Sequence, residues 1–244
     1  MGFSREIKVE GIILKTTNFK ESSLILLALV KGIGKISILA KGAKGQKSRF
    51  LGKLNILNCL KMELYKTPSS DIYTLKEVEL KKQYLQNESI QKTIYYFCAS
   101  ELLNQLEALG EHSYFNLFIN YLDTVQKGSI KPLYIFIRFC LRLFKTMGIE
   151  LNTINCGNCF KKLDGKTIYY NTLNGIVCCQ KNSETIESKL ATIMTNIYQL
   201  EKIPKDLKVE KKQLQEFIKL VILHLEYHFN KRIKINSIQL LTGK

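Results

Sequence analysis

The sequence predicts an α+β protein: a small five-stranded barrel, followed by a helical domain that carries a cysteine-rich insert. Three observations predict this. Apolar residues alternate along short, turn-bounded segments up to about residue 81, recur at helical spacing from residue 88, and give way after residue 150 to two cysteine pairs. We therefore expect a barrel domain over residues 1–81, a helical domain over 82–150 and 183–244, and an insert over 151–182.

Five segments rich in Ile, Leu, Val and Tyr predict the strands of the barrel: Val9–Lys15, Ser23–Val30, Lys35–Lys41, Leu54–Tyr65 and Ile72–Val78. Gly32 and Gly34 suit a tight hairpin between the second and third strands, where φ turns positive. Five short strands in about 80 residues are typical of a closed barrel of the OB type, which leaves few bare sheet edges. An SH3-like barrel fits the pattern nearly as well.

The charge of the chain predicts a polyanionic partner. The formal net charge is +16, and residues 22–62 contain eight Lys or Arg but no Asp or Glu. Six cations in the third strand and the loop after it are the expected contacts to nucleic-acid phosphates: Lys35, Lys41, Lys44, Lys47, Arg49 and Lys53. Glycines predict a mobile loop that follows successive phosphates without reading bases. The alternative is a loop whose lysines serve only solubility.

Aromatic side chains near this loop are candidates for stacking on the bases of a single strand. They are Phe19, Phe50, Tyr65 and Tyr73, and each of them also suits a core position. Phe50 lies inside the basic segment and is the first one to test.

Helical spacing predicts five helices, over residues 89–109, 113–127, 132–147, 189–200 and 209–230. Ser89 and Ser113 are expected N-caps, and Pro132 suits the first turn of the third helix. That helix carries three cations on one face: Arg138, Arg142 and Lys145. This face is either a solvated surface or a docking site for an acidic peptide.

Two cysteine pairs lie in the insert, Cys156 with Cys159 and, after 18 intervening residues, Cys178 with Cys179. A CxxC spacing lets two thiolates bind one tetrahedral Zn²⁺, and the gap suits a four-cysteine zinc ribbon. Residues 167–170 and 175–177 are expected to form its hairpin. The sequence thus predicts a structural zinc site with these four cysteines, and a decayed site with buried thiols is the alternative.

The fourth zinc ligand is left open by the sequence, because the second pair is adjacent and Lys181 stands where a CxxC would place its second cysteine. Cys178 has the better spacing, Cys179 needs an unusual local geometry, and His224 or His228 would have to come from a distance. The remaining cysteines, Cys59, Cys98 and Cys140, fall on apolar faces and are expected in the core.

No nucleotide-binding loop, zinc-protease motif or nucleophile elbow is present in the sequence, so we expect no enzyme activity. No run of 18 apolar residues predicts a transmembrane helix, and the first ten residues lack the apolar stretch of a secretory signal. A cytoplasmic chain with reduced thiols and no membrane contact is therefore expected.

A succession of short motifs resembles the RecO family of bacterial recombination mediators. The motifs are Glu10–Lys15, Glu21–Ser23, Gly34–Ile36, Ala40–Ala43, Ile137–Phe139 before Met147-Gly148, the cysteine insert, and His228–Lys234. The chain departs from the family pattern at Lys181, where a cysteine is usual, and at Lys234–Ser237, where a Lys-Ser pair is usual.

The resemblance implies an N-terminal OB-fold, a helical domain and a zinc-finger-like insert. It implies binding of single- and double-stranded DNA, annealing of complementary strands and, with RecR, help for RecA in replacing the single-strand-binding protein SSB, in a nucleoid-associated setting. The acidic SSB tail would fit Arg138, Arg142 and Lys145. The competing interpretation is a ribosome- or tRNA-associated OB-fold protein that binds RNA and carries a zinc knuckle.

Overall fold

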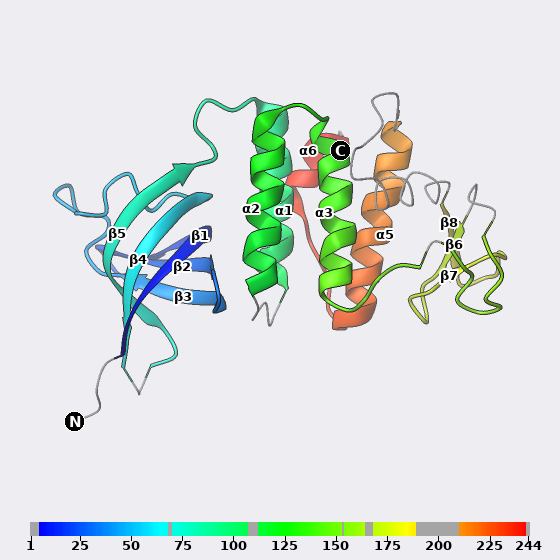
Figure 1. Ribbon diagram of the computed structural model, residues 1–244, viewed down its shortest axis with the longest axis horizontal. Coiled ribbons are helices and arrows are strands. Elements are labelled where there is room, and N and C mark those ends of the chain that lie inside the picture. Colours follow the sequence, from blue (N-terminus) through cyan, green and yellow to red (C-terminus); the bar gives the residue numbers. More distant parts are fainter. Residues whose placement is uncertain are drawn as a thin grey trace. The chain divides into compact units, whose positions relative to one another are not determined.

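The computed structural model describes residues 5–67, 70–106, 112–152, 154–163, 168–188 and 210–242. Its internal contacts divide the chain into two units, residues 1–122 and 123–244. The first unit begins with a barrel and continues into helices, and the second combines helices with a small second sheet (Figure 1). Among the described helices, none has the length and apolar character needed to cross a membrane.

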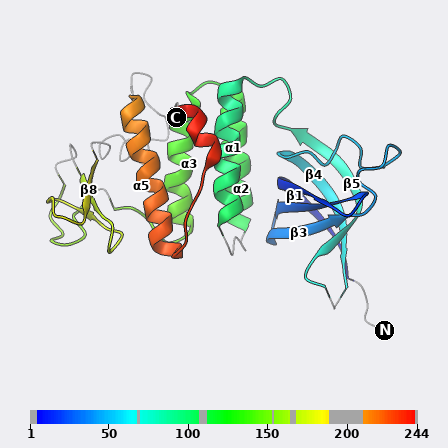
Figure 2. The same cartoon turned by 180° about the vertical axis from the view of Figure 1, so that it is seen from behind.

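Five strands form the barrel: β1 (Arg5–Phe19), β2 (Ser23–Val30), β3 (Gly34–Ala40), β4 (Asn58–Lys66) and β5 (Tyr73–Gln83). Their order is β1-β2-β3-β5-β4, and the sheet is closed, as Figure 2 shows from behind. The long strand β1 pairs with both β2 and β4, while a short parallel pairing of β3 with β5 completes the ring. This closure confirms the predicted OB-type barrel.

Close approach of strands explains the glycine in β1. Gly11 pairs with Val30 of β2 and with Leu60 of β4. A Cβ atom at Gly11 would lie 2.7 Å from the Cε of Met62 and 3.0 Å from a methyl group of Val30. Only glycine lets the one strand serve both neighbours without displacing these core side chains.

The core of the barrel is built from alternating strand residues and from three apolar residues of the β3–β4 loop. The strand residues are Ile13, Leu26, Ala28, Val30, Ile38, Ala40, Leu60, Met62, Leu64 and Leu75, and the loop adds Ala43, Phe50 and Leu54. The predicted start of the fourth strand at Leu54 is therefore wrong. Leu54 is buried as a loop residue, and β4 begins at Asn58.

The helices are α1 (Ile90–Gln105), α2 (His112–Lys127), α3 (Pro132–Thr146), α5 (Lys211–Phe229) and α6 (Gln239–Thr242), with a 3₁₀ turn η1 (Asn236–Ile238). Ser89 caps α1 as predicted, because its hydroxyl accepts the N–H of Lys92. Ser113 already lies within α2, so its predicted role as an N-cap is wrong. The helix predicted over 189–200 lies outside the described residues.

A three-stranded sheet with the order β7-β6-β8 is formed by β6 (Ile168–Asn171), β7 (Val177–Cys178) and β8 (Thr185–Ser188), so the sheet continues past the predicted end of the insert at residue 182. The predicted hairpin corresponds to β6 and β7. The third strand, β8, was missed because Thr185–Ser188 is short and shows little apolar alternation. The predicted core cysteines Cys59, Cys98 and Cys140 are all buried.

A buried histidine joins α5 to the insert and to the chain after α3. Nε2 of His224 lies 2.6 Å from the carbonyl oxygen of Ile149, and Nδ1 lies 3.0 Å from the hydroxyl of Tyr170. A carbonyl only accepts, so Nε2 carries the proton and Nδ1 accepts from the tyrosine. Both ring nitrogens are thus engaged within the unit, and His224 is not available as the distant metal ligand considered above.

We expect this histidine to lower the free energy of unfolding as the pH falls from 6.5 to 4. Burial, reinforced by the neighbouring His228, lowers the pKa of His224 to about 4. The unfolded chain then binds the proton first as pH falls below 6.5, so the free energy of unfolding drops by about 2 kcal/mol at pH 5. Denaturant unfolding of wild type and His224→Gln at pH 7 and pH 5 checks this. The variant should lose this part of the pH dependence, and an identical pH dependence in both proteins would contradict it.

Candidate nucleic-acid interface and cysteine cluster

The basic loop, residues 41–57, is a series of turns held down by buried anchors. Backbone bonds link Gly45 to Gly42, Ser48 to Gly45, Leu51 to Ser48 and Lys53 to Phe50. Ala43, Phe50 and Leu54 are at most 8% exposed and pack into the barrel core. The loop therefore has a buried inner side, and its cations lie on the exposed outer side.

Phe50 cannot stack on a base, because it is 3% exposed and belongs to the barrel core. Of the two roles that the sequence left open for Phe50, the structure gives it the core position. The guanidinium of Arg49 lies over the Phe50 ring at 5.0 Å from its centroid, so this aromatic side chain positions a cation instead.

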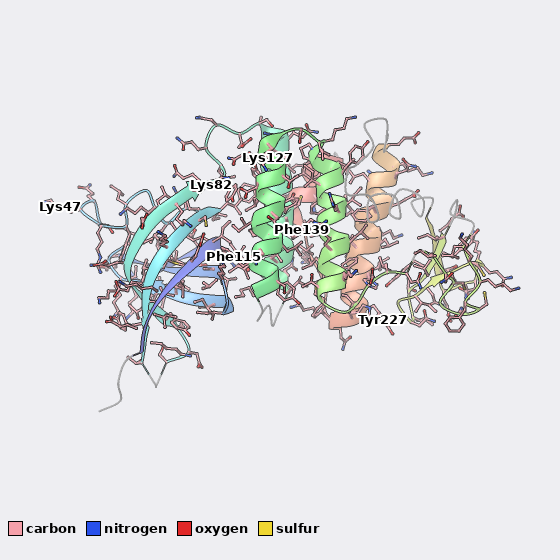
Figure 3. All side chains as sticks on the ribbon, in the orientation of Figure 1. Lys47, Lys82, Phe115, Lys127, Phe139 and Tyr227 are labelled. Carbon is pink, nitrogen blue, oxygen red and sulfur yellow. The ribbon has the colours of Figure 1, made fainter. Side chains whose placement is uncertain are left out.

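The outer face of the basic loop carries exposed Lys41, Lys44, Lys47 and Arg49. Figure 3 shows Lys47 at the outer end of the loop, away from the strands. Within the described part of the chain, Lys41, Lys44 and Lys47 have no carboxylate at ion-pair distance. Lys53 is half-buried, and its ammonium reaches the carbonyl oxygen of Val78 at 3.5 Å.

Lys35 has a different task from the loop cations. Its ammonium donates to the carbonyls of Leu103, Asn104 and Leu106 at the C-terminal end of α1. The last carbonyls of a helix lack partners within the helix and carry partial negative charge, so a lysine there acts as a cap. We leave Lys35 out of the candidate interface for this reason.

Three acidic side chains of the barrel are paired across β1, β4 and β5. Lys76 bonds Glu6 and Glu63 at 3.1 and 3.0 Å, and Lys81 bonds Glu10 at 2.9 Å. The hydrogen bond from Lys81 lowers the pKa of Glu10, and that from Lys76 lowers the pKa of Glu63. These carboxylates therefore have lysine partners within the sheet, whereas the basic loop contains five Lys or Arg and no acidic residue.

The β1–β2 turn adds an aromatic and a cation to the basic loop. The N–H of Lys44 donates to the carbonyl of Ser22 at 2.9 Å, which ties the loop to this turn. Phe19 is 37% exposed, and the ammonium of Lys20 lies 5.6 Å from its ring centroid. Sequence reasoning missed Lys20 because the acid-free interval begins only after Glu21, so Lys20 lies just outside it. Phe19 is the predicted stacking candidate that the structure leaves exposed beside the loop.

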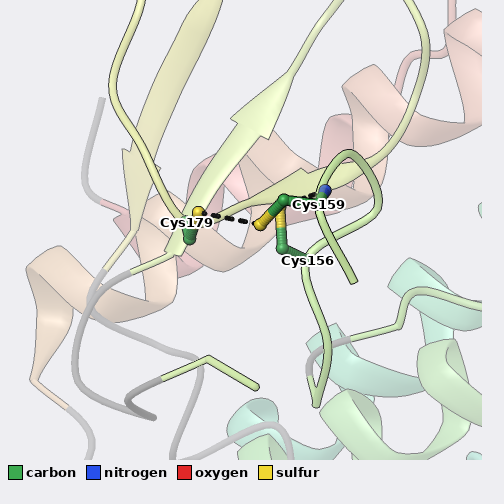
Figure 4. A group of neighbouring side chains, drawn as sticks. All are labelled: Cys156, Cys159 and Cys179. Carbon is green, nitrogen blue, oxygen red and sulfur yellow. Dashed lines mark hydrogen bonds between the residues drawn. The ribbon is translucent and has the colours of Figure 1, made fainter. Parts of the chain in front are cut away.

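Three cysteines of the insert come together, as Figure 4 shows. The sulfurs of Cys156, Cys159 and Cys179 all lie within 4.8 Å of one another, and those of Cys159 and Cys179 are 3.6 Å apart. Two sulfurs that share a tetrahedral metal at about 2.3 Å are about 3.8 Å apart, so the spacing fits a metal. The N–H groups of Asn158 and Cys159 point at the Cys156 sulfur at 3.4 and 3.5 Å.

Cys178 is outside this group of three, contrary to the spacing argument that favoured it over Cys179. Cys178 is buried in β7, where the side-chain amide of Asn158 donates to its sulfur at 3.4 Å. Cys178 also hydrogen-bonds with Cys156 and lines the same hollow as the cluster, but its sulfur does not belong to the set that all lie within 4.8 Å of one another. Lys181 is exposed and lines the hollow beside the cluster.

The thiols of the cluster differ in acidity. Burial alone would raise the pKa of Cys156, but the backbone N–H groups of Cys159 and Asn158 lower it to about 6. Hydrogen bonding with Cys159 raises the pKa of Cys179 to about 11. A zinc ion bound by Cys156, Cys159 and Cys179 would connect the CxxC knuckle to the end of β7. The fourth coordination position of the metal would stay open to another ligand.

The three cations predicted on the third helix lie on α3 as a narrow strip. Arg142 and Lys145 are exposed, and Arg138 is half-buried. The rest of α3 is almost entirely buried, including Phe136, Phe139 and Phe144. The strip is therefore flanked by core residues.

Two family models match the chain in succession. The model described as Recombination protein O N terminal matches residues 3–84, and the one described as Recombination protein O C terminal matches residues 87–236. The first covers the barrel, and the second covers α1, α2, α3, α5 and the insert.

Curated relatives match over most of the chain, two of them over nearly its full length. A DNA repair protein RecO of Alkaliphilus metalliredigens is 25% identical over 243 residues, covering 96% of this chain and 98% of the relative. That of Caldicellulosiruptor bescii is 26% identical over 242 residues, covering 94% and 96%. That of Clostridium novyi is 28% identical over 186 residues, covering 74% and 72%.

Proposed function

Because the chain belongs to the recombination protein O (RecO) family, we propose that it acts as a DNA-repair mediator that grips the DNA backbone through its basic loop. The observation that carries this is the set of unpaired, exposed cations Lys41, Lys44 and Lys47 on an anchored loop. They neutralise phosphates of single- and double-stranded DNA, and Arg49, Lys53, Lys20 and Phe19 extend the surface.

A grip of this kind suits annealing. Bringing two complementary strands together requires neutralised backbones and accessible base edges, and cations on an outward-facing loop provide the first without covering the second. We propose that the protein anneals complementary strands and, with RecR, helps RecA to replace SSB on single-stranded DNA. It acts in the cytoplasm at the nucleoid and without catalysis of its own.

The second half of the mechanism is recognition of a protein on the DNA. Arg138, Arg142 and Lys145 offer positive charge along α3 beside apolar side chains, which suits the acidic tail of SSB. We propose that the cysteine cluster binds a structural zinc ion. The three-part domain organisation, with the insert over 151–182, remains our proposal.

The competing function is RNA binding at the ribosome or on tRNA, and a comparison of affinities separates the two. Single-stranded DNA and RNA of one length are titrated with the native protein, with and without SSB on the strand. We expect the protein to bind single-stranded DNA in preference to RNA, and to keep binding the DNA when SSB is present. Preference for RNA together with indifference to SSB would contradict the mediator function.

A further inference from the structure

An exposed aromatic side chain marks the tip of the cysteine knuckle. Phe160 directly follows Cys159, is 80% exposed and has a left-handed φ of 59°. Its N–H donates to the carbonyl of Cys156 at 2.9 Å, and the N–H of Cys156 donates to the carbonyl of Lys161 at 2.9 Å. These bonds close the knuckle and place residue 160 in the left-handed region.

The knuckle itself does not need this phenylalanine. Glycine adopts the left-handed region without steric cost, whereas a bulky aromatic residue rarely occurs there. A ring with four-fifths of its surface exposed also adds little to the packing of the insert. The side chain therefore fits a contact with a partner better than a structural role.

The surroundings of Phe160 are cationic and amide-rich. Lys161 and Lys162 follow it and are exposed. A hollow of about 280 Å³ beside the cysteines is lined, apart from the sulfurs, by Lys161 and Lys181 and by the carboxamides of Asn158, Gln180 and Asn182. No carboxylate lines this hollow, and the described residues 154–163 and 168–182 include no Asp or Glu.

We propose that this knuckle is a second nucleic-acid contact, in which a base of single-stranded DNA stacks on Phe160 while Lys161, Lys162 and Lys181 neutralise its phosphates. Every base presents a π-face, so such stacking tolerates any sequence, and carboxamides bond base edges or the backbone. A protein-binding hot spot is typically an aromatic group ringed by well-packed contacts, whereas this one is ringed by cations and amides. The proposal rests on the proposed DNA-binding function and adds a contact in the second unit.

A single-tryptophan probe tests the stacking directly, because the chain contains no Trp. In Phe160→Trp, the indole is the only tryptophan, and its fluorescence is expected to be quenched when a single-stranded oligonucleotide is added. Leu173→Trp is the matched control: Leu173 is 65% exposed on the β6–β7 turn of the same insert. Its fluorescence should not change on DNA addition.

The affinity of Phe160→Ala supplies the second readout. Loss of one stacked base is expected to weaken single-stranded DNA binding by roughly 5- to 150-fold. The unfolding transition should be unchanged, because the side chain is exposed. An unquenched Phe160→Trp with wild-type affinity in Phe160→Ala would overturn this proposal, and would assign the tip to a protein partner, even if the basic loop still binds DNA. A native protein that binds no single-stranded DNA would overturn both proposals.

Discussion

Replacing Lys41, Lys44 and Lys47 together with alanine is expected to weaken single-stranded DNA binding on the order of 100-fold at about 0.1 M salt. Each lysine that neutralises a phosphate releases about 0.7 of a counterion, so three contacts reduce the log–log salt slope by about 2. The difference between variant and wild type should therefore shrink as salt rises toward about 1 M. Fluorescence anisotropy with a labelled oligonucleotide over a series of salt concentrations measures both quantities.

Lys35→Ala is the control for the loss of a single lysine, because it removes one positive charge from the neighbouring strand β3. Its ammonium binds the carbonyls at the end of α1, so its loss should lower the free energy of unfolding by about 1–2 kcal/mol. The salt slope should stay close to that of wild type. If the triple variant kept the wild-type slope, the basic loop would be only a solvated surface.

Replacing Cys159 with alanine is expected to abolish metal binding, whereas the same change at Cys178 should leave it. Of these two cysteines, only Cys159 belongs to the group of three sulfurs that lie within 4.8 Å of one another. Metal binding by a structural thiolate site contributes about 10 kcal/mol or more to the folded state, so losing a ligand should also unfold the knuckle. Elemental analysis of the purified proteins measures the zinc content directly.

Susceptibility of the insert to limited proteolysis provides a second measurement of the same prediction. Cys159→Ala should be cleaved within the insert at lower protease concentrations than Cys178→Ala. Full zinc loading of Cys159→Ala, or loss of zinc from Cys178→Ala alone, would show that the ligand set is wrong. A native protein without metal would exclude the structural-zinc proposal altogether.

The barrel was largely predictable from the sequence, because alternation and turn residues report which strand face is buried. The predicted bounds of β2 agree with the structure, and β3 differs only at its ends. The predicted start of the fourth strand was wrong because Phe50 and Leu54 are apolar for another reason: they anchor a loop in the core of the barrel. A hydrophobic pattern does not distinguish a strand from a loop that plugs the core.

The candidate sites were predictable in composition but only partly in geometry. Charge counting found the basic loop, yet it could not show that the ammonium of Lys35 caps a helix nearly 70 residues later. Spacing found the cysteine insert, but it favoured Cys178, whereas the group of three close sulfurs contains Cys179. Both differences come from long-range contacts.

The annealing of complementary DNA strands coated with SSB, compared with naked strands, tests the mediator function most directly. The native protein should accelerate annealing in both cases, and the Lys41, Lys44 and Lys47 triple variant should lose most of this acceleration. Acceleration of naked strands alone would limit the chain to backbone neutralisation. No acceleration on SSB-coated strands by the native protein, with or without RecR, would contradict its role as a recombination mediator.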